Sequence, residues 1–215
     1  MEFFHKRTWA EIDLSTAEKN LNILKGFIDE TKTRPCCVLK AFGYGHGDIN
    51  LMKLYQTLGV DFFAVSNIDE AIGLRKHGCT GDILILGYTA PQYAAELSRF
   101  DIIQAAVSEE YAEELSEAAK SPVRVHIKLD TGMGRIGLIA KDREKCLEEI
   151  AEIRALPNLV CEGIFTHFAV ADSFEKESCD YTDMQKELFF SIAEEAGGFK
   201  DVHCLNSAGA ELHYD

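Results

Sequence analysis

Seven short apolar segments recur along the chain, each rich in β-branched and aromatic residues with few polar positions between them. Runs of this kind are typical of strands that are buried on both faces, as in a parallel sheet covered by helices. The predicted strands lie at residues 36–41, 61–67, 82–87, 101–107, 124–130, 160–168 and 202–209. The pattern therefore indicates a parallel sheet inside a helical layer.

The segments between these runs place apolar residues three and four positions apart, which predicts helices. Several of them end in glycine, and Pro91 and Ser108 stand where helix starts are expected. The predicted helices lie at residues 51–59, 68–78, 91–100, 108–120, 142–156 and 182–198. Strand and helix thus alternate along the chain.

This alternation is compatible with a doubly wound sheet or with a barrel, because both are built from right-handed crossovers. We favour an α/β barrel of the TIM type, the (β/α)₈ fold. Such a barrel typically needs about 250 residues. This chain has 215 residues and ends just after its seventh predicted strand. We therefore expect an incomplete barrel with seven of the eight strands.

The residues that precede the first barrel strand predict two further elements. Residues 7–15 have the composition of an additional strand, and residues 15–31 that of an amphipathic helix beginning after Ser15 or Thr16. No linker interrupts the chain, so we expect residues 1–215 to form one domain.

The composition, with 47% hydrophobic and 27% charged residues, is that of a globular protein. A net charge of −14 without a basic patch repels nucleic-acid backbones, so we expect no nucleic-acid partner. No apolar run approaches the roughly 18 residues of a membrane helix, and the N-terminus lacks the apolar stretch of a signal peptide. We therefore expect a cytoplasmic protein without a membrane span.

The seven cysteines are odd in number and scattered, and they contain no CxxC pair. The histidines other than His167 likewise show no spacing typical of metal ligands. The sequence thus predicts reduced thiols, with neither a disulfide framework nor a metal site.

In a barrel of this type the functional residues lie at the carboxyl ends of the strands. Lys40 is notable there, because burying an ammonium without a partner is costly. It could extend to solvent or pair with an acid. Alternatively, a desolvated lysine loses its proton readily and can form a Schiff base with a cofactor aldehyde. The neighbouring glycines and the phenol of Tyr44, which could orient a phosphate or a ring oxygen, favour the second interpretation.

A glycine-rich loop follows residues 124–130 and contains Arg135. Its glycines match the GxGxxG pattern of dinucleotide sites, but that pattern should open a helix directly, whereas helical periodicity resumes only several residues later. Arg135 is better interpreted as a guanidinium presented to an anion, either a phenolate or a carboxylate.

Two further strand ends carry candidate residues. A lone histidine such as His167 is more often a satisfied core residue, but at a strand tip its flat imidazole could stack on a cofactor ring. Asn206 and Ser207 are candidate polar and phosphate anchors. For Ser207 the alternative is a helix N-cap.

Five segments resemble, in order, the successive motifs of one enzyme family: RTWAEIDLSTAEKNLNILK, VLKAFGYGHG, KLDTGMGRIG, EGIFTHFAVAD and LNSAGA. They extend over essentially the whole chain, and their occurrence in order is far more specific than any single motif. The chain resembles the N-terminal barrel domain of the alanine racemases, which depend on pyridoxal 5′-phosphate (PLP). The resemblance implies interconversion of L- and D-alanine by two-base proton transfer, which supplies D-alanine for peptidoglycan, in a homodimer.

The resemblance also implies roles for individual residues. Lys40 would carry the cofactor and act as one of the two bases. Tyr44 and Ser207, beside Asn206, would help to hold the phosphate. Arg135 would bond the phenolic oxygen of the cofactor, and His167 would pack on its ring.

Two more positions are informative in the same comparison. Lys128 matches a lysine that is often carbamylated, and a carbamate would support the guanidinium of Arg135 because the two charges are opposite. Phe42 replaces a polar residue found in many family members, and we expect this change to alter packing and not chemistry.

Family members continue into an eighth strand and a C-terminal β-domain, which contributes a tyrosine across the dimer as the second base. The strand expected within residues 1–15 would normally pair with that domain. Racemisation requires a base on each face of Cα. We therefore expect this chain, as a truncated form, to bind PLP weakly or not at all and to have little racemase activity alone.

The substrate stays open, because LGYTAPQYA and THFAVADS are also similar to segments of serine and dual alanine/serine racemases of the vancomycin-resistance type. A PLP-binding protein without turnover is a further alternative. From another class, the glycine-rich loop leaves a Rossmann-type dehydrogenase as the competing hypothesis.

Overall fold

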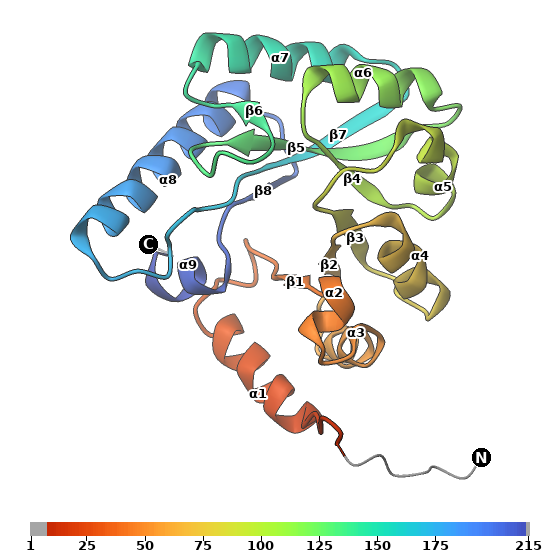
Figure 1. Ribbon diagram of the computed structural model, residues 1–215, viewed down its shortest axis with the longest axis vertical. Helices are drawn as coiled ribbons and strands as arrows, with labels where there is room; N and C mark the ends of the chain where they lie inside the picture. Colours follow the sequence, from red (N-terminus) through yellow and green to blue (C-terminus); the bar gives the residue numbers. More distant parts are fainter. Residues whose placement is uncertain (1–7, 214–215) are drawn as a thin grey trace.

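The computed structural model of the chain describes residues 8–213, in which the strands form a curled parallel sheet with helices on its outside (Figure 1). The strand order is β1-β2-β3-β4-β5-β7-β8, and the two-residue strand β6 (Leu138–Ile139) pairs with β5 outside this order. The ordered strands are β1 (Cys36–Val38), β2 (Phe62–Val65), β3 (Asp82–Ile85), β4 (Ile103–Ala106), β5 (Val123–Asp130), β7 (Leu159–Phe165) and β8 (Asp201–His203). The prediction of seven parallel barrel strands is confirmed.

Helices connect these strands, as the periodicity predicts. Asn67 and Ser108 begin two of them by accepting backbone N–H groups of the first turn. The helices are α1 (Leu14–Lys25), α2 (Lys40–Tyr44), α3 (Asp48–Thr57), α4 (Ile68–Lys76), α5 (Ala94–Arg99), α6 (Glu109–Ala118), α7 (Arg143–Ala155), α8 (Lys176–Ala196) and α9 (Ser207–Leu212), with the 3₁₀ turn η1 (Pro91–Tyr93) before α5. Among the helices described, none is long and apolar enough to cross a bilayer.

The two faces of the sheet form separate apolar cores, because successive side chains of a strand point to opposite faces. On β2, Phe63 and Val65 pack under the helices, whereas Phe62 and Ala64 point into the interior of the barrel. All four are buried. Burial on both faces explains why the strands are continuous apolar runs without polar alternation.

The interior contacts show that the sheet curls into a partial barrel and is not an open doubly wound sheet. The ring of Phe62 on β2 lies 5.7 Å from that of His203 on β8, although four strands separate β2 from β8 in the sheet order. Arg34, just before β1, also reaches Asp201 at the start of β8, with 2.9 Å between Nη2 and Oδ2. The two edge strands therefore approach each other at their amino ends.

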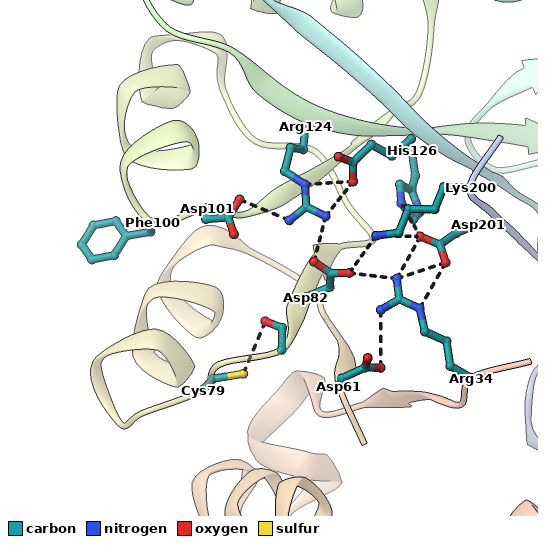
Figure 2. Close-up of polar contacts among 12 residues, drawn as sticks. Arg34, Asp61, Cys79, Asp82, Phe100, Asp101, Arg124, His126, Lys200 and Asp201 are labelled. Carbon is teal, nitrogen blue, oxygen red and sulfur yellow. Dashed lines mark hydrogen bonds and ion pairs between the residues drawn. The ribbon is translucent and has the colours of Figure 1, made fainter. Parts of the chain in front are cut away.

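A network of charged side chains lies at these amino ends, as Figure 2 shows. One oxygen of Asp82 lies 2.8 Å from Nη2 of Arg34, and the other lies 2.8 Å from Nη2 of Arg124. Arg124 also bonds Glu162 at 2.6 Å. Burial alone would raise the pKa of Asp82, but the two guanidinium groups outweigh it and lower that pKa to about 2. The network stabilises the closed arrangement of the strands.

The strand predicted at residues 7–15 is wrong over the part that the structure describes. Residues 8–13 form no strand, and Leu14 already belongs to α1. The carboxylate of Asp13 accepts the backbone N–H of Ser15 at 2.8 Å, so Asp13 begins the helix in place of the predicted Ser15 or Thr16. A strand needs an adjacent strand edge for its hydrogen bonds, and within residues 8–213 no strand pairs with this segment. Arg7 lies outside the described residues.

Several other boundaries differ from the prediction. The first strand ends at Val38 and the last at His203, short of the predicted residues 41 and 209. The predicted strand at 202–209 instead turns into α9, because the side chain of Asn206 caps that helix. The helix expected over 15–31 ends at Lys25, and α8 begins at Lys176, before the predicted residue 182. These shifts move residues between elements but leave the order of elements unchanged.

Candidate cofactor-binding site

The candidate residues named from the sequence lie at or just beyond the carboxyl ends of strands. Because the strands of the barrel are parallel, these ends share one rim of the sheet. Lys40 follows β1, Lys128 is on β5, Arg135 is in the loop after β5, His167 follows β7, and Asn206 and Ser207 lie between β8 and the first turn of α9.

Lys40 opens an unusual backbone segment. Ala41, Phe42 and Gly43 have φ values of 53°, 57° and 59°, so α2 is a left-handed turn. Left-handed backbone costs about 1–2 kcal/mol for a residue with a side chain. The Lys40 ammonium lies 5.9 Å from the centroid of the Tyr44 ring, which brings these two candidates together.

Lys128 is buried at the end of β5. Its ammonium donates to the backbone carbonyl of Leu129 and lies 5.5 Å from the centroid of the Phe165 ring. Burial lowers the pKa of Lys128 to about 8; Asp130 raises it and Arg135 lowers it further. A substantial fraction of this amine is therefore neutral near pH 8, unlike an ordinary lysine.

His167 is half-buried and lies among positive charges. Burial lowers the pKa below its usual value, and the positive charges of Arg135, Lys128 and Lys40 lower it further. Both effects favour the uncharged form of the imidazole. Three positive charges and one flat ring thus act on the same rim, a combination suited to an aromatic ligand that carries negative charge.

Asp130 organises the loop that carries Arg135, a role that sequence reasoning missed. Its carboxylate accepts backbone N–H groups from Gly132 at 2.9 Å, Gly134 at 3.0 Å and Arg135 at 2.9 Å. Burial raises the pKa of Asp130, but these hydrogen bonds and Lys128 outweigh it, so the pKa is lowered. The short Asp-x-Gly-x-Gly spacing was the available signal, because glycines let successive amides turn toward one carboxylate.

The dinucleotide interpretation of this loop is wrong. The loop runs into β6, and α7 begins only at Arg143, so the glycines do not open a helix. Gly137 serves close packing: at its φ of +119°, a Cβ would lie 2.7 Å from the carbonyl oxygen of Lys128. The glycine-rich segment is thus a loop laid against β5.

A buried polar network supports the same rim and was also missed. Thr131 and Thr166, which follow β5 and β7, share a hydrogen bond of 2.8 Å. Gln185 of α8 donates to Thr131 at 3.1 Å and accepts the backbone N–H of Ala169 at 3.0 Å. All three side chains are buried. The network ties the Arg135 loop and the His167 segment to one helix.

The last two candidates lie at the start of α9. Asn206 accepts the backbone N–H of Gly209 at 2.8 Å, so the N-cap that was the alternative for Ser207 is formed by Asn206. Ser207 is the first helical residue and is exposed, which leaves its hydroxyl accessible.

Comparisons with known proteins agree on one family. The family model described as alanine racemase, N-terminal domain, matches residues 12–215. Alanine racemase 1 of Bacillus subtilis (strain 168) is 38% identical over 208 residues, which cover 95% of this chain and 52% of the relative. The alanine racemase of Desulfovibrio desulfuricans is 39% identical over 213 residues, 97% of this chain and 56% of the relative. The chain thus spans about half the length of the curated relatives it matches.

Solved structures give the same result. The alanine racemase of Clostridium difficile 630 in complex with cycloserine superposes with a TM-score of 0.90 at 35% identity, covering 99% of this chain and 59% of that one. A histidine racemase from Leuconostoc mesenteroides superposes with a TM-score of 0.81 at 28% identity, covering 91% of this chain and 52% of that one. The matched barrel therefore occurs in racemases with differently named substrates.

Proposed function

Because the chain belongs to the alanine racemase family, we propose that it provides the PLP-binding barrel of an amino-acid racemase whose substrate is alanine. The observation that carries this proposal is the position of Lys40, Lys128, Arg135 and His167 on one rim, where the three positive charges lower the pKa of His167. In the same reading, D-alanine for peptidoglycan is the product, the cytoplasm is the site of action, and a homodimer is the assembly.

The residues at the rim fit the chemistry of PLP, which is an anionic aromatic aldehyde. Lys40 supplies the amine for the aldehyde, and Arg135 supplies a guanidinium for the phenolic oxygen. Tyr44 and the exposed hydroxyl of Ser207, next to Asn206, would donate to the phosphate. His167 offers a flat ring for stacking. When bound, the cofactor would supply an electron sink for the substrate Cα.

Proton movement at the substrate requires a base on each face of Cα. We assign one face to Lys40, whose amine would take or return the proton there. The second base, which the family resemblance places on a tyrosine, would come from the half of the relatives that this chain does not match. We therefore expect the chain alone to bind PLP weakly and to racemise alanine little.

Lys128 is the proposed site of carbamylation. Its lowered pKa leaves a neutral amine that can attack carbon dioxide, forming an N–C bond and releasing one proton to give a carbamate. The carbamate would be an anion next to Arg135. A carbamate resonance in ¹³C NMR with labelled bicarbonate, absent in Lys128→Met, would support this assignment, and its absence from the unmodified chain would contradict it.

The proposal is tested by mixing the purified chain with PLP and recording its absorbance before and after borohydride reduction. Peptide mapping should then locate the label on Lys40, and Lys40→Arg should lose it. Far-UV circular dichroism establishes that the sample is folded. A folded chain that is not labelled at Lys40 would contradict the proposal.

The choice of substrate is tested separately. Adding the chain to a complementary C-terminal half allows kcat/KM to be compared for alanine, serine and histidine. Preference for alanine is expected, whereas preference for serine would support the alternative from the sequence. Labelling without turnover of any substrate would support a PLP-binding protein without catalysis.

A further inference from the structure

Glu70, in the first turn of α4, joins the ends of two neighbouring strands. Its Oε1 accepts the backbone N–H of Ala41 at 2.8 Å. Its Oε2 accepts both the backbone N–H and the hydroxyl of Ser66, each at 2.8 Å. Ala41 follows Lys40 directly and Ser66 follows β2, so one carboxylate connects the lysine segment to the adjacent strand.

These contacts continue the sheet where its regular hydrogen bonding ends. The N–H of Leu39 donates to the carbonyl of Ala64 at 2.8 Å, between the β1 and β2 segments. Beyond it the chain enters the left-handed turn and cannot follow the strand geometry. Lys40 is thus held on one side by this backbone bond and on the other by Glu70 through Ala41.

The left-handed turn needs such an anchor. Ala41 and Phe42 both carry a Cβ, and each has φ above +50°. This backbone is less favourable than right-handed backbone, and it persists only where surrounding contacts hold it. A carboxylate accepts N–H donors more strongly than a neutral oxygen.

The side chain of Glu70 is not needed to cap its own helix. Asn67 already performs that role, because its side chain accepts the N–H of Glu70 at 3.0 Å. The carboxylate is therefore directed at the strand ends. Its neighbour Asp69 carries the same charge on the same turn but is exposed, which makes Asp69 the matched control.

From this geometry we propose that Glu70 is a positioning residue for Lys40, fixing the direction from which the lysine amine meets a carbonyl. The inference rests on the proposed function, in which Lys40 reacts with an aldehyde. It adds a residue outside the rim of cations, and it acts through the backbone of Ala41.

The test compares Glu70→Ala and Glu70→Gln with the unmodified chain and with Asp69→Asn. Each protein is exposed to PLP and borohydride, and peptide mapping gives the label on Lys40 relative to that on the exposed Lys120. We expect the ratio to fall about tenfold in Glu70→Ala, because the loss of one charge-assisted hydrogen bond corresponds to roughly a tenfold change in rate. In Glu70→Gln the ratio should fall less, because the single carbonyl oxygen of the glutamine can still accept a hydrogen bond from one backbone N–H. Asp69→Asn should match the unmodified chain.

A second readout follows the backbone directly. Hydrogen exchange at the Ala41 amide, observed by NMR, should speed up in Glu70→Ala and not in Asp69→Asn. Thermal unfolding of each variant gives any general loss of stability, and if Glu70→Ala does not fold, Glu70→Gln carries both readouts.

A folded Glu70 variant that loses stability but keeps the Lys40 to Lys120 ratio within about twofold of the unmodified chain would overturn the proposal, because the role would then be structural only. If the unmodified folded chain is not labelled at Lys40, the proposed function fails. The exchange rate of Ala41 then decides separately whether Glu70 holds the turn.

Discussion

The two ends of the barrel differ in how their charged side chains are paired. At the amino ends of the strands, Arg34 and Arg124 alternate with Asp82, Asp201 and other acids, and each charge lies against an opposite one (Figure 2). At the carboxyl ends, the positive charges of Lys40, Lys128 and Arg135 all lower the pKa of His167. Within residues 8–213, these three cations form no ion pair with an acid.

This difference suggests that the charges at the amino ends stabilise the fold, whereas those at the carboxyl ends are available to a ligand. Paired charges at the amino ends satisfy one another and hold the first and last strands together. At the carboxyl ends, the carboxylate of Asp130 accepts hydrogen bonds from three backbone N–H groups. The amino end of the barrel thus closes the fold, and we propose that the positive charge at the carboxyl end binds an anion.

The largest expected effect is at the amino ends. Asp82→Asn should lower the free energy of unfolding by about 3 kcal/mol, because it leaves two partly buried arginines short of a partner. Urea denaturation measures the change. Asp61→Asn is the control, because the Asp61 side chain is 65% exposed and its contact with Arg34 is longer, at 3.4 Å. This change should alter the free energy of unfolding by less than about 0.5 kcal/mol. Equal losses of stability in both variants would mean that the pairing of Asp82 with two arginines contributes no more than an exposed ion pair.

At the carboxyl ends, removing a charge should have the opposite effect. Lys128→Met should raise the free energy of unfolding at pH 7 by about 2 kcal/mol, because a buried ammonium is replaced by an apolar chain of similar length. The folded pKa of about 8 lies below the usual lysine value of 10.5, so the destabilisation is complete below pH 8 and disappears toward pH 10.5.

Denaturation in bicarbonate-free buffer across this pH range measures the gain from Lys128→Met. Added bicarbonate should narrow the difference from the unmodified chain if Lys128 is carbamylated. A loss of stability at pH 7 without bicarbonate would show that the ammonium is favourably paired.

Acid should weaken the amino end. The pKa of Asp82 is lowered from 3.8 to about 2, so its contribution is complete above pH 4 and is lost as the pH falls through 2. This contribution is about 2 kcal/mol. Accordingly, the stability difference between the unmodified chain and Asp82→Asn should shrink between pH 4 and pH 2 in urea titrations. A constant difference over that range would contradict the assigned pKa.

The smallest expected effect is stabilisation by a simple anion. Inorganic phosphate at about five times its Kd should raise the free energy of unfolding by about 1 kcal/mol if it binds the cations at the carboxyl ends. Arg135→Gln should reduce this gain. Lys200→Gln, which removes a cation at the amino ends, should not. An equal reduction in both variants would indicate general screening of charge.

Several features of the site could be predicted from the sequence because they depend on local order. Each apolar run marks a strand, parallel strands end on one rim, and the residues after each run therefore face the same region. Lys40, Lys128 and His167 were placed there on that basis. The prediction of a strand before Leu14 was wrong, because a strand forms only beside another strand, and the local sequence pattern does not show whether one is present.

By itself, the sequence determined the alternation of strand and helix, the rim that carries the candidate residues, and the family motifs. Only the tertiary structure decided that the sheet curls, that Asp82 pairs two arginines, and that Glu70 reaches Ala41 across two strand ends. The reason is physical: periodicity and capping are set by neighbours along the chain, whereas a charge or hydrogen bond is satisfied by whatever residue folding brings within about 3 Å.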